Sequence, residues 1–311
     1  MTPRILVIRG GAIGDFILTL PAIKLMRENF PGARIEILGY KHIIALAEGR
    51  YYCEATRSIE YAPMAGFFVP GFELSPELIE YFSGFQQIVS YLYDPNGYFE
   101  ANLRRAGAKN ILPAYSAPDD SQHVTLQLAR PLQQMALYLE DSGAQIYPNA
   151  EDFKFADAFL AGISKPVIAI HPGSGSPRKN WGLEKWLITA RALLDLEPQP
   201  ELLWVGGEAD EERLDAIQNA FGRSAHIARH LPLPHLAAVL ARCRLFLGHD
   251  SGISHLAAAV GTPSVLLFGP TDPAVWAPAN PHVIVMEAAD CDLSRIQPAM
   301  VSEKVRAIWN G

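Results

Sequence analysis

Short apolar runs alternate with segments of helical periodicity along almost the whole chain, and the alternation restarts once near the middle. Repeated strand–helix–strand units of this kind favour parallel sheets, because strands covered on both faces read as continuous apolar runs. The pattern predicts an α/β protein made of two doubly wound, Rossmann-like domains that face each other across a cleft. In such folds ligands bind beside the carboxyl ends of the strands.

The predicted elements fall into two sets. In the first half we expect strands at 4–9, 33–39, 86–92 and 109–113, with helices at 15–29, 75–83, 97–106 and 122–141. In the second half we expect strands at 166–173, 201–207, 244–250 and 263–270, with helices at 183–195, 209–221, 252–260 and 299–309. Residues 143–165 lose periodicity and read as a linker. We therefore expect domains at 1–150 and 151–311, and the last helix could pack back on the first domain.

Composition restricts the class of protein. The chain has 311 residues, 49% of them hydrophobic, and a net charge of -7, which suits a packed core and argues against non-specific nucleic-acid binding. Three scattered cysteines indicate neither a disulfide framework nor a zinc site. No run approaches the roughly 18 apolar residues of a membrane span, and the amino terminus reads as a strand. We expect a cytoplasmic protein, with docking to a membrane surface left open.

The first glycine turn, Gly10-Gly11-Ala12-Ile13-Gly14-Asp15, joins the first strand to the first helix. It has neither the dinucleotide-binding spacing nor that of a P-loop. Asp15 could simply complement the positive end of the helix dipole. Alternatively, a carboxylate on this rigid junction could accept a proton from a substrate hydroxyl, and the helix end favours its ionised form. We interpret Asp15 as a general base.

Two stretches in the second half could bind an anion. The loop 171–181 combines the small residues Ser174 and Ser176 with Arg178 and Lys179, as a phosphate-binding loop before a helix does, although it could be a flexible basic loop.

The second stretch contains Asp250, Ser251 and Gly252 at a strand end, followed by His255 one helical turn later. A Ser/His/Asp triad is conceivable, but the spacing is not that of a nucleophile elbow. A second anion site beside the first is the simpler interpretation.

Other polar and aromatic stretches allow weaker hypotheses. After the strand 201–207, Glu208 or Glu211 could accept hydrogen bonds from ribose hydroxyls, whereas most of that acidic cluster reads as a solvated first helical turn. Asp290 and Asp292 resemble a metal-binding pair but lie in an unpatterned tail. Residues 61–72 are unusually aromatic and form either local core or a lip that touches an acceptor or a membrane.

Three stretches together resemble the bacterial glycosyltransferase family 9, the heptosyltransferases of lipopolysaccharide core assembly: GGAIGDFILTLPAI, HPGSGSPRKNW and DSGISHLAAAVGTPSVLLFGPTDP. The resemblance implies a GT-B fold, with the acceptor bound mainly by the first domain and the nucleotide-sugar by the second. It implies a metal-independent, inverting enzyme without a resident cofactor, whose donor is an ADP-linked sugar. Localisation is then cytoplasmic, with peripheral contact at the cytoplasmic face of the inner membrane.

The resemblance also places roles on residues. The family's catalytic aspartate falls on Asp15, and its diphosphate-contacting lysine falls on Lys179. Ser251 and Gly252 fall near the phosphates. Ser174, Ser176, Asp250 and His255 match the same blocks, whereas the ribose carboxylate stays open between Glu208 and Glu211.

The chain departs from the family pattern in its first domain. The chain is somewhat short, and residues 50–120 contain no acceptor motif that can be placed. The basic residues Arg104, Arg105 and Lys109 could meet an acidic or phosphorylated acceptor, or form a solvated face. A non-catalytic nucleotide-sugar-binding scaffold is the alternative function, and a nucleotide-dependent oxidoreductase is a third hypothesis that the missing fingerprint glycines disfavour.

Overall fold

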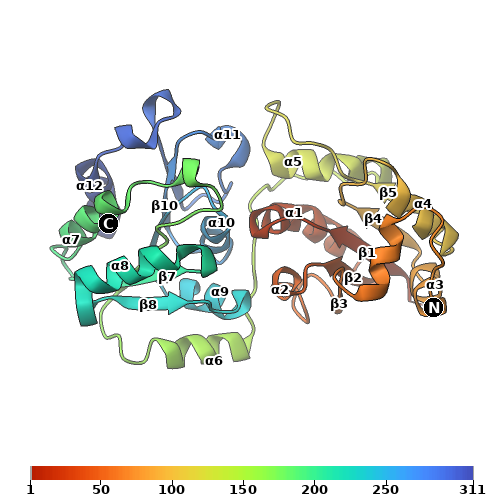
Figure 1. The fold of residues 1–311 in the computed structure, drawn as a ribbon, viewed down its shortest axis with the longest axis horizontal. Coiled ribbons are helices and arrows are strands. Elements are labelled where there is room, and N and C mark those ends of the chain that lie inside the picture. The colour runs from red at the N-terminus through yellow and green to blue at the C-terminus, as the bar shows by residue number, and fades with distance from the viewer. Residues whose placement is uncertain (1, 311) are drawn as a thin grey trace. The chain divides into compact units, whose positions relative to one another are not determined.

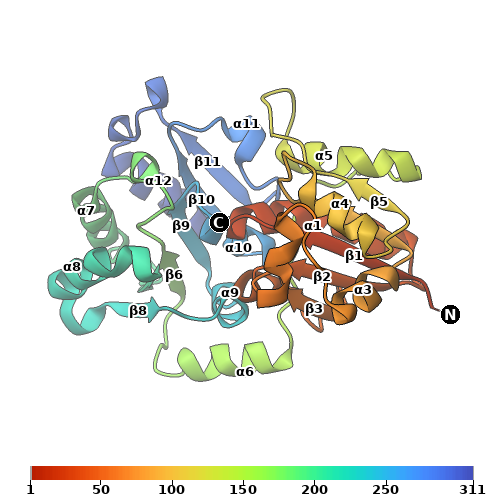
Figure 2. The same ribbon diagram turned by 45° about the vertical axis from the view of Figure 1, so that its right-hand side comes forward.

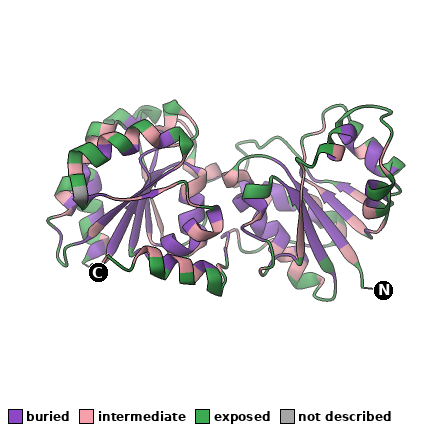
Figure 3. Ribbon diagram, turned by 60° about the horizontal axis from the view of Figure 1, so that its bottom comes forward, coloured by how far each residue is buried: buried purple, intermediate pink, exposed green. Residues whose placement is uncertain are grey.

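The computed structural model describes residues 2–310, apart from the side chain of Arg223, and divides into two compact units between Ser142 and Gly143 (Figure 1). Each unit contains one parallel sheet flanked by helices. In Figure 3 the central strands of each sheet are buried, whereas the helices expose their outer faces. The predicted α/β fold class with two parallel sheets is therefore confirmed.

The first unit holds a five-stranded sheet in the order β3-β2-β1-β4-β5. Its strands are β1 (Arg4–Arg9), β2 (Arg34–Gly39), β3 (Ala55–Ser58), β4 (Gln87–Ser90) and β5 (Ile111–Pro113). Its α-helices are α1 (Ile13–Asn29), α2 (Lys41–Ile44), α3 (Pro76–Ser83), α4 (Tyr98–Arg105) and α5 (Val124–Ala129). Because β1 pairs with both β2 and β4, the strand order reverses at β1, and Ile8 lies opposite Ser90 at the carboxyl end of this pair.

The second unit holds a six-stranded sheet in the order β11-β10-β9-β6-β7-β8. Its strands are β6 (Val167–Ile170), β7 (Glu201–Gly206), β8 (His226–Arg229), β9 (Leu245–His249), β10 (Ser264–Phe268) and β11 (Val283–Glu287). Its α-helices are α6 (Ala150–Phe159), α7 (Leu183–Leu193), α8 (Glu211–Phe221), α9 (Leu233–Ala241), α10 (Gly252–Ala259), α11 (Pro273–Trp276) and α12 (Pro298–Trp309) (Figure 2). This is the dinucleotide-fold strand order, which reverses between β6 and β9.

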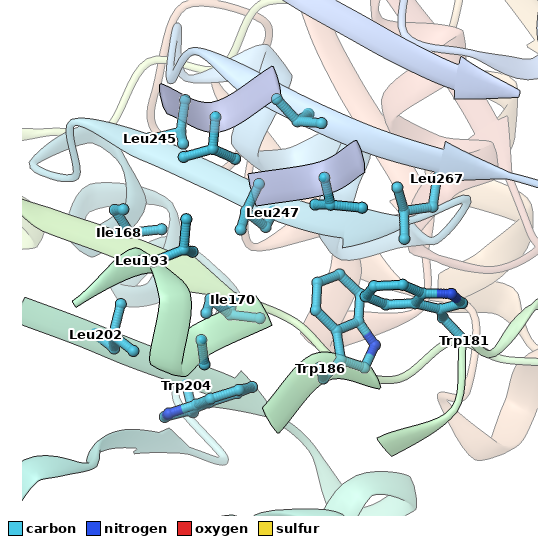
Figure 4. Close-up of a cluster of buried hydrophobic side chains, with 14 of the residues drawn as sticks. Ile168, Ile170, Trp181, Trp186, Leu193, Leu202, Trp204, Leu245, Leu247 and Leu267 are labelled. Atoms are coloured by element: carbon cyan, nitrogen blue, oxygen red, sulfur yellow. The ribbon is translucent and has the colours of Figure 1, made fainter. Parts of the chain in front are cut away.

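The core of the second unit extends to the loop that was predicted to bind an anion. Aliphatic side chains of β6, β7, β9 and β10 pack together, and the rings of Trp181 and Trp186 close one end of this cluster (Figure 4). The two rings meet edge-on at 4.9 Å, and the indole N–H of Trp181 donates to the carbonyl of Ile296 at 3.1 Å. Trp181 ends the predicted anion-binding loop, so burial of its ring holds one end of that loop.

Two predicted segments differ from the structure. The linker predicted at 143–165 contains the helix α6, whose first turn is closed by reciprocal side-chain-to-backbone hydrogen bonds between Asn149 and Asp152 at 2.8 and 2.9 Å. The helix predicted at 122–141 is also wrong, because α5 ends at Ala129 and continues only as a 3-10 turn, Arg130–Met135, which contains Pro131. Sequence reasoning also missed the short strands β3, β8 and β11.

Other features of the fold bear on the predictions. Helix α12 packs against α7 within the second unit. The aromatic segment 61–72 includes a 3-10 helix, Ala62–Phe68, in which Met64 and Phe67 are buried core residues whereas Phe68 is exposed, as is Phe72 beyond it. No helix within residues 2–310 is both long enough and apolar enough to cross a membrane.

Candidate active site

The first glycine turn follows β1 at the point where the strand order reverses. Gly11 has a φ of +95°, which favours glycine, and a Cβ there would lie 2.7 Å from Oδ2 of Asp15. Gly10 is also close-packed, because its Cβ would lie 3.0 Å from Leu92, and Gly14 lies in the first turn of α1. The turn therefore brings the backbone close against the carboxylate of Asp15.

Asp15 is held in place but remains open to solvent. Its Oδ2 accepts a hydrogen bond at 2.8 Å from the backbone N–H of Ala12, the residue that precedes α1 and caps it. Its Oδ1 lies 3.5 Å from Nη2 of Arg9, and 41% of the Asp15 side chain is exposed. A carboxylate fixed in this way at a sheet's reversal point can accept a proton from a bound hydroxyl.

Arg9, which sequence reasoning missed, is the buried partner of Asp15. Its side chain is only 9% exposed and donates to the backbone carbonyls of Asp15, at 3.2 and 3.3 Å, and of Tyr91, at 3.3 Å. Burial lowers the pKa of the guanidinium, and the nearby Asp15 carboxylate opposes this effect. Arg9 thus ties together the carboxyl ends of β1 and β4. Its signal in the sequence is a single charge that ends an apolar strand.

In the second unit, Lys179 and Asp250 form an ion pair at the reversal point between β6 and β9. Nζ of Lys179 lies 2.6 Å from Oδ2 of Asp250, which also accepts a hydrogen bond from the hydroxyl of Thr271 at 2.7 Å. The Asp250 side chain is 9% exposed, whereas that of Lys179 is 31% exposed. The structure thus brings together two predicted residues that are 71 positions apart in the chain.

Ser251 caps the amino terminus of α10, and its hydroxyl oxygen accepts a hydrogen bond from the backbone N–H of Ser254 at 3.3 Å. Gly252 is the first residue of this helix, and His255 is buried one turn further on. The amino-terminal N–H groups of α10 therefore lie next to Asp250, at the carboxyl end of β9. A helix end in this position favours a negatively charged ligand.

A buried Ser–His–Asp chain connects three strand ends. Nδ1 of His171 lies 3.3 Å from Oγ of Ser251, and its Nε2 lies 3.3 Å from Oδ2 of Asp210. Burial raises the pKa of Asp210, but the hydrogen bond and charge of His171, with smaller contributions from Gly207 and Arg213, lower it overall. Ser251 is buried and caps a helix, so this chain orients His171 rather than presenting a nucleophile.

Asp210 corrects one interpretation of the acidic cluster. Asp210 is buried, at 6% exposed, whereas Glu208 and Glu212 of the same cluster are exposed, so Asp210 is the exception to the solvated first turn that we expected for most of the cluster. A Cβ on Gly173 would lie only 1.7 Å from Oδ1 of Asp210, so glycine is required at this close approach. The sequence contained only a weak signal, because Asp210 lies four residues after the end of the buried strand β7 and its partner His171 is 39 residues away.

His249 holds both ends of the predicted anion-binding loop and was also missed by sequence reasoning. Its Nε2 accepts a hydrogen bond from the backbone N–H of Trp181 at 2.7 Å, and its Nδ1 lies 3.3 Å from the carbonyl of Gly173. Burial lowers the pKa of His249 to about 3, so the ring is neutral at pH 7. A neutral ring with Nδ1–H satisfies both bonds.

The remaining predicted donor-binding residues lie around this centre without direct bonds to it. Ser174 donates to the carbonyl of Ser176 at 2.7 Å within the loop, and Arg178 is exposed. Glu211 pairs with Arg229 and His230, whereas Glu208 is exposed beside β7.

The acidic pair in the tail is separate from these groups. Asp292 accepts hydrogen bonds from the backbone N–H and the hydroxyl of Ser294, at 2.9 and 2.6 Å.

The sequence model of glycosyltransferase family 9 (heptosyltransferase) matches residues 103–297, more than half of the chain. The chain belongs to this family.

A relative with a known role matches about half of the chain in sequence. Lipopolysaccharide heptosyltransferase 1 of Escherichia coli (strain K12) is 26% identical over 161 residues, which cover 50% of this chain and about half the length of that relative.

Solved family structures share the fold over nearly the whole chain. The glycosyltransferase family 9 protein of Veillonella parvula DSM 2008 superposes with a TM-score of 0.82 at 20% identity, covering 98% of this chain and 97% of that one. The E. coli heptosyltransferase WaaC, solved with ADP, has a TM-score of 0.73 at 17% identity and coverage of 98% and 99%. The chain therefore has the GT-B fold of heptosyltransferases.

Proposed function

We propose that this protein is an inverting, metal-independent glycosyltransferase that moves a heptose from ADP-heptose onto a lipopolysaccharide core or related glycan. Membership of glycosyltransferase family 9 supports the reaction class. The related E. coli enzyme WaaC has been solved with ADP and with ADP-2-deoxy-2-fluoro heptose, which supports an ADP-linked donor. In this proposal the first unit binds the acceptor and the second binds the donor.

Asp15 is the general base of the proposed reaction. It takes the proton of an acceptor hydroxyl while that oxygen forms a bond to the anomeric carbon of the donor sugar. The bond from the same carbon to the diphosphate oxygen breaks, and the electron pair leaves with ADP. A single displacement of this kind inverts the anomeric configuration. The exposed face of Asp15 leaves room for the hydroxyl, while Ala12 and Arg9 hold the carboxylate.

Lys179 binds the departing diphosphate and stabilises the charge that grows on it. Its ammonium already neutralises the buried carboxylate of Asp250, and its exposed fraction allows a second anion to bind on its open side. Ser251 and Gly252 add backbone N–H groups at the start of α10.

The other donor contacts have smaller roles. Ser174, Ser176 and Arg178 line the phosphate side of the proposed donor site, and His255 supports the first turn of α10. Of the two candidate ribose carboxylates, Glu208 is the better one, because Glu211 is already paired with Arg229 and His230. The acidic net charge of -7 fits a carbohydrate enzyme rather than a nucleic-acid binder. We place the enzyme in the cytoplasm, in peripheral contact with the inner membrane.

The observation that carries this proposal is the fixed, 41% exposed carboxylate of Asp15 beside a buried guanidinium. Asp15→Asn keeps the side-chain shape but cannot accept the proton. We expect turnover of ADP-heptose with a core oligosaccharide to fall roughly 10²–10⁴-fold, with ADP affinity unchanged. All five tryptophans lie in the second unit, so tryptophan fluorescence reports ADP binding there.

Two outcomes contradict the proposal. Wild-type rates in Asp15→Asn would remove Asp15 as the base. Binding of ADP by a wild-type protein that turns over no ADP-sugar would instead support the non-catalytic scaffold. Titration with UDP and GDP in the same assay identifies the nucleotide.

A further inference from the structure

A small hollow opens at the carboxyl ends of β4 and β5 in the first unit. Its volume is about 170 Å³, and its lining includes Leu92, Tyr93, Asp94, Glu100 and Tyr115. Drug-sized ligands occupy pockets of about 300–1,000 Å³, so this hollow has room for one ring rather than a long glycan. It belongs to the unit to which the proposed function assigns the acceptor.

Two tyrosine rings form the apolar side of the hollow. Tyr93 and Tyr115 lie with their ring centroids 5.2 Å apart and their planes inclined at 55°. Tyr93 is 65% exposed and Tyr115 is 41% exposed, so both rings present apolar surface to solvent. The face of an aromatic ring carries negative charge density and attracts weakly positive hydrogen atoms. The C–H groups on one face of a pyranose ring provide such hydrogens.

Carboxylates form the polar side of the hollow. Asp94 is fixed, because its Oδ2 accepts a hydrogen bond from the backbone N–H of Glu100 at 2.9 Å in the first turn of α4. Glu100 is oriented by Arg104, whose Nη2 lies 2.6 Å from Oε1. Ionised carboxylates only accept hydrogen bonds, so they match the hydroxyl groups of a sugar.

The same charges disfavour an anionic ring. None of the described residues that line the hollow is Lys or Arg. Of the basic residues predicted to meet an acidic acceptor, Arg104 is paired with Glu100, and Arg105 donates to the carbonyl of Phe72 at 2.9 Å and to Oδ1 of Asn102 at 2.7 Å. Lys109 is exposed and is not part of the lining. A phosphate or carboxylate in the hollow would therefore meet acceptors and negative charge.

The hollow adjoins the turn that carries Asp15. Leu92 lines the hollow, and its Cδ1 lies 3.0 Å from where a Cβ on Gly10 would be. The residue before Leu92 in the chain is Tyr91, whose backbone carbonyl accepts a hydrogen bond from Arg9, the partner of Asp15. A ring bound in the hollow thus lies beside the Gly10–Asp15 turn.

We infer that this hollow is the acceptor subsite and that it binds an uncharged pyranose ring, stacked on Tyr93 and Tyr115 and hydrogen-bonded to Asp94 and Glu100. The inference rests on the proposed function for the acceptor role. The binding itself can be measured without donor or turnover.

Saturation-transfer NMR of the full chain tests the inference with two matched probes, methyl β-glucopyranoside and methyl β-glucopyranosiduronate. They differ only in the carboxylate. We expect the neutral glycoside to bind in preference to the uronate, and Tyr93→Ala to weaken its binding roughly fivefold. Tyr138→Ala is the matched control, because Tyr138 is 64% exposed in the same unit but does not line the hollow. Asp94→Asn keeps a side-chain oxygen that can accept the hydrogen bond from the backbone N–H of Glu100 but removes the negative charge. It should therefore reduce the difference in affinity between the neutral glycoside and the uronate.

The inference is overturned if the uronate binds as well as the neutral glycoside, if neither probe binds, or if Tyr93→Ala behaves like Tyr138→Ala. Because both tyrosines are exposed, their replacement leaves the core intact, which circular dichroism verifies. Turnover of Asp15→Asn and ADP titration are independent of these readouts. Failure of the acceptor subsite can therefore be distinguished from failure of the proposed function.

Discussion

The two sheets reverse their strand order in the same way, but the ion pairs at the two reversal points have opposite arrangements. In the first unit the cation is buried and the carboxylate is open, since Arg9 is 9% exposed and Asp15 is 41% exposed. In the second unit the carboxylate is buried and the cation is open, since Asp250 is 9% exposed and Lys179 is 31% exposed. In each pair the buried partner positions the exposed one. The exposed group is the one that can meet substrate.

This difference fits the two halves of the proposed reaction. A base must remove a proton from a hydroxyl, so the open group in the first unit is a carboxylate. A departing diphosphate accumulates negative charge, so the open group in the second unit is an ammonium. The same fold therefore presents opposite charges to solvent in its two units. The sign depends on which charged residue is buried at the strand end and which one the following helix or loop places beside it.

After the loss of the base itself, the largest expected effect comes from removing the exposed cation. Lys179→Ala leaves the buried carboxylate of Asp250 without its ammonium and removes the positive charge offered to the diphosphate. We expect kcat/KM to fall by about 10²–10³-fold, together with a loss of ADP affinity in the tryptophan titration. Lys304→Ala, an exposed lysine of α12, is the control. If Lys179→Ala binds ADP as tightly as the wild type does, the exposed cation of the second unit does not bind the diphosphate.

Removing the buried cation should have a smaller and more specific effect. Arg9→Met keeps an unbranched apolar stem but removes the charge beside Asp15. It also removes the hydrogen bonds that Arg9 donates to the backbone carbonyls of Tyr91 and Asp15. We expect kcat to fall about 10–100-fold with little change in the KM for donor.

Arg9→Lys provides the control for a merely structural role of Arg9. It restores the charge beside Asp15 and should recover part of the lost kcat, with the KM for donor unchanged. If Arg9→Lys recovers no more of kcat than Arg9→Met does, the charge of Arg9 does not act through Asp15.

Part of this arrangement could be predicted from the sequence, because it depends on local patterns. Continuous apolar runs predicted most of the strands of both sheets, and residues in the turns and loops that follow those strands were recognised as site candidates. Asp15, Lys179 and Asp250 were all named on that basis. Placing a second anion site beside the first agrees with the rule that carboxyl ends of parallel strands meet at one edge, and the structure shows Lys179 in contact with Asp250.

The missed features depend on partners that are far apart in sequence. Arg9, Asp210 and His249 are buried polar residues, and each is satisfied by groups that the fold brings close. No pattern within a short window distinguishes a buried charge at a strand end from an exposed one. Helix α6 was different, because its Asn149-to-Asp152 capping signal was present in the sequence but the surrounding residues lacked clear periodicity.

Acid should destabilise the second unit through His249, which has no counterpart at the first reversal point. Burial lowers its pKa from 6.5 to about 3. Between these values the unfolded chain binds a proton that the folded unit does not, so stability falls as pH falls. From pH 7 to pH 5 the free energy of unfolding should decrease by about 2 kcal/mol from this group. The lowered pKa of Asp210 acts only below about pH 4, outside this range.

Urea unfolding followed by tryptophan fluorescence measures this effect in the second unit alone. His249→Asn should be less stable than the wild type at pH 7 but lose less stability between pH 7 and pH 5. His42→Gln replaces an exposed histidine of the first unit and should follow the wild-type dependence. Equal pH dependence in wild type and His249→Asn would show that His249 is not the responsible group.

The smallest expected effect is a difference in stability between alanine substitutions in the first glycine turn and in the loop 171–181. Gly11 has a φ of +95°, and a Cβ there would lie 2.7 Å from Oδ2 of Asp15, whereas a Cβ on Gly175 meets no atom within 4 Å. Gly11→Ala should therefore cost about 1–2 kcal/mol of stability, measured by circular dichroism during urea unfolding, and should also lower turnover by displacing Asp15. Gly175→Ala should change stability by no more than about 0.5 kcal/mol. If the two substitutions cost the same, then the first turn does not depend on glycine to hold Asp15, and the close packing that distinguishes it from the second loop has no energetic consequence.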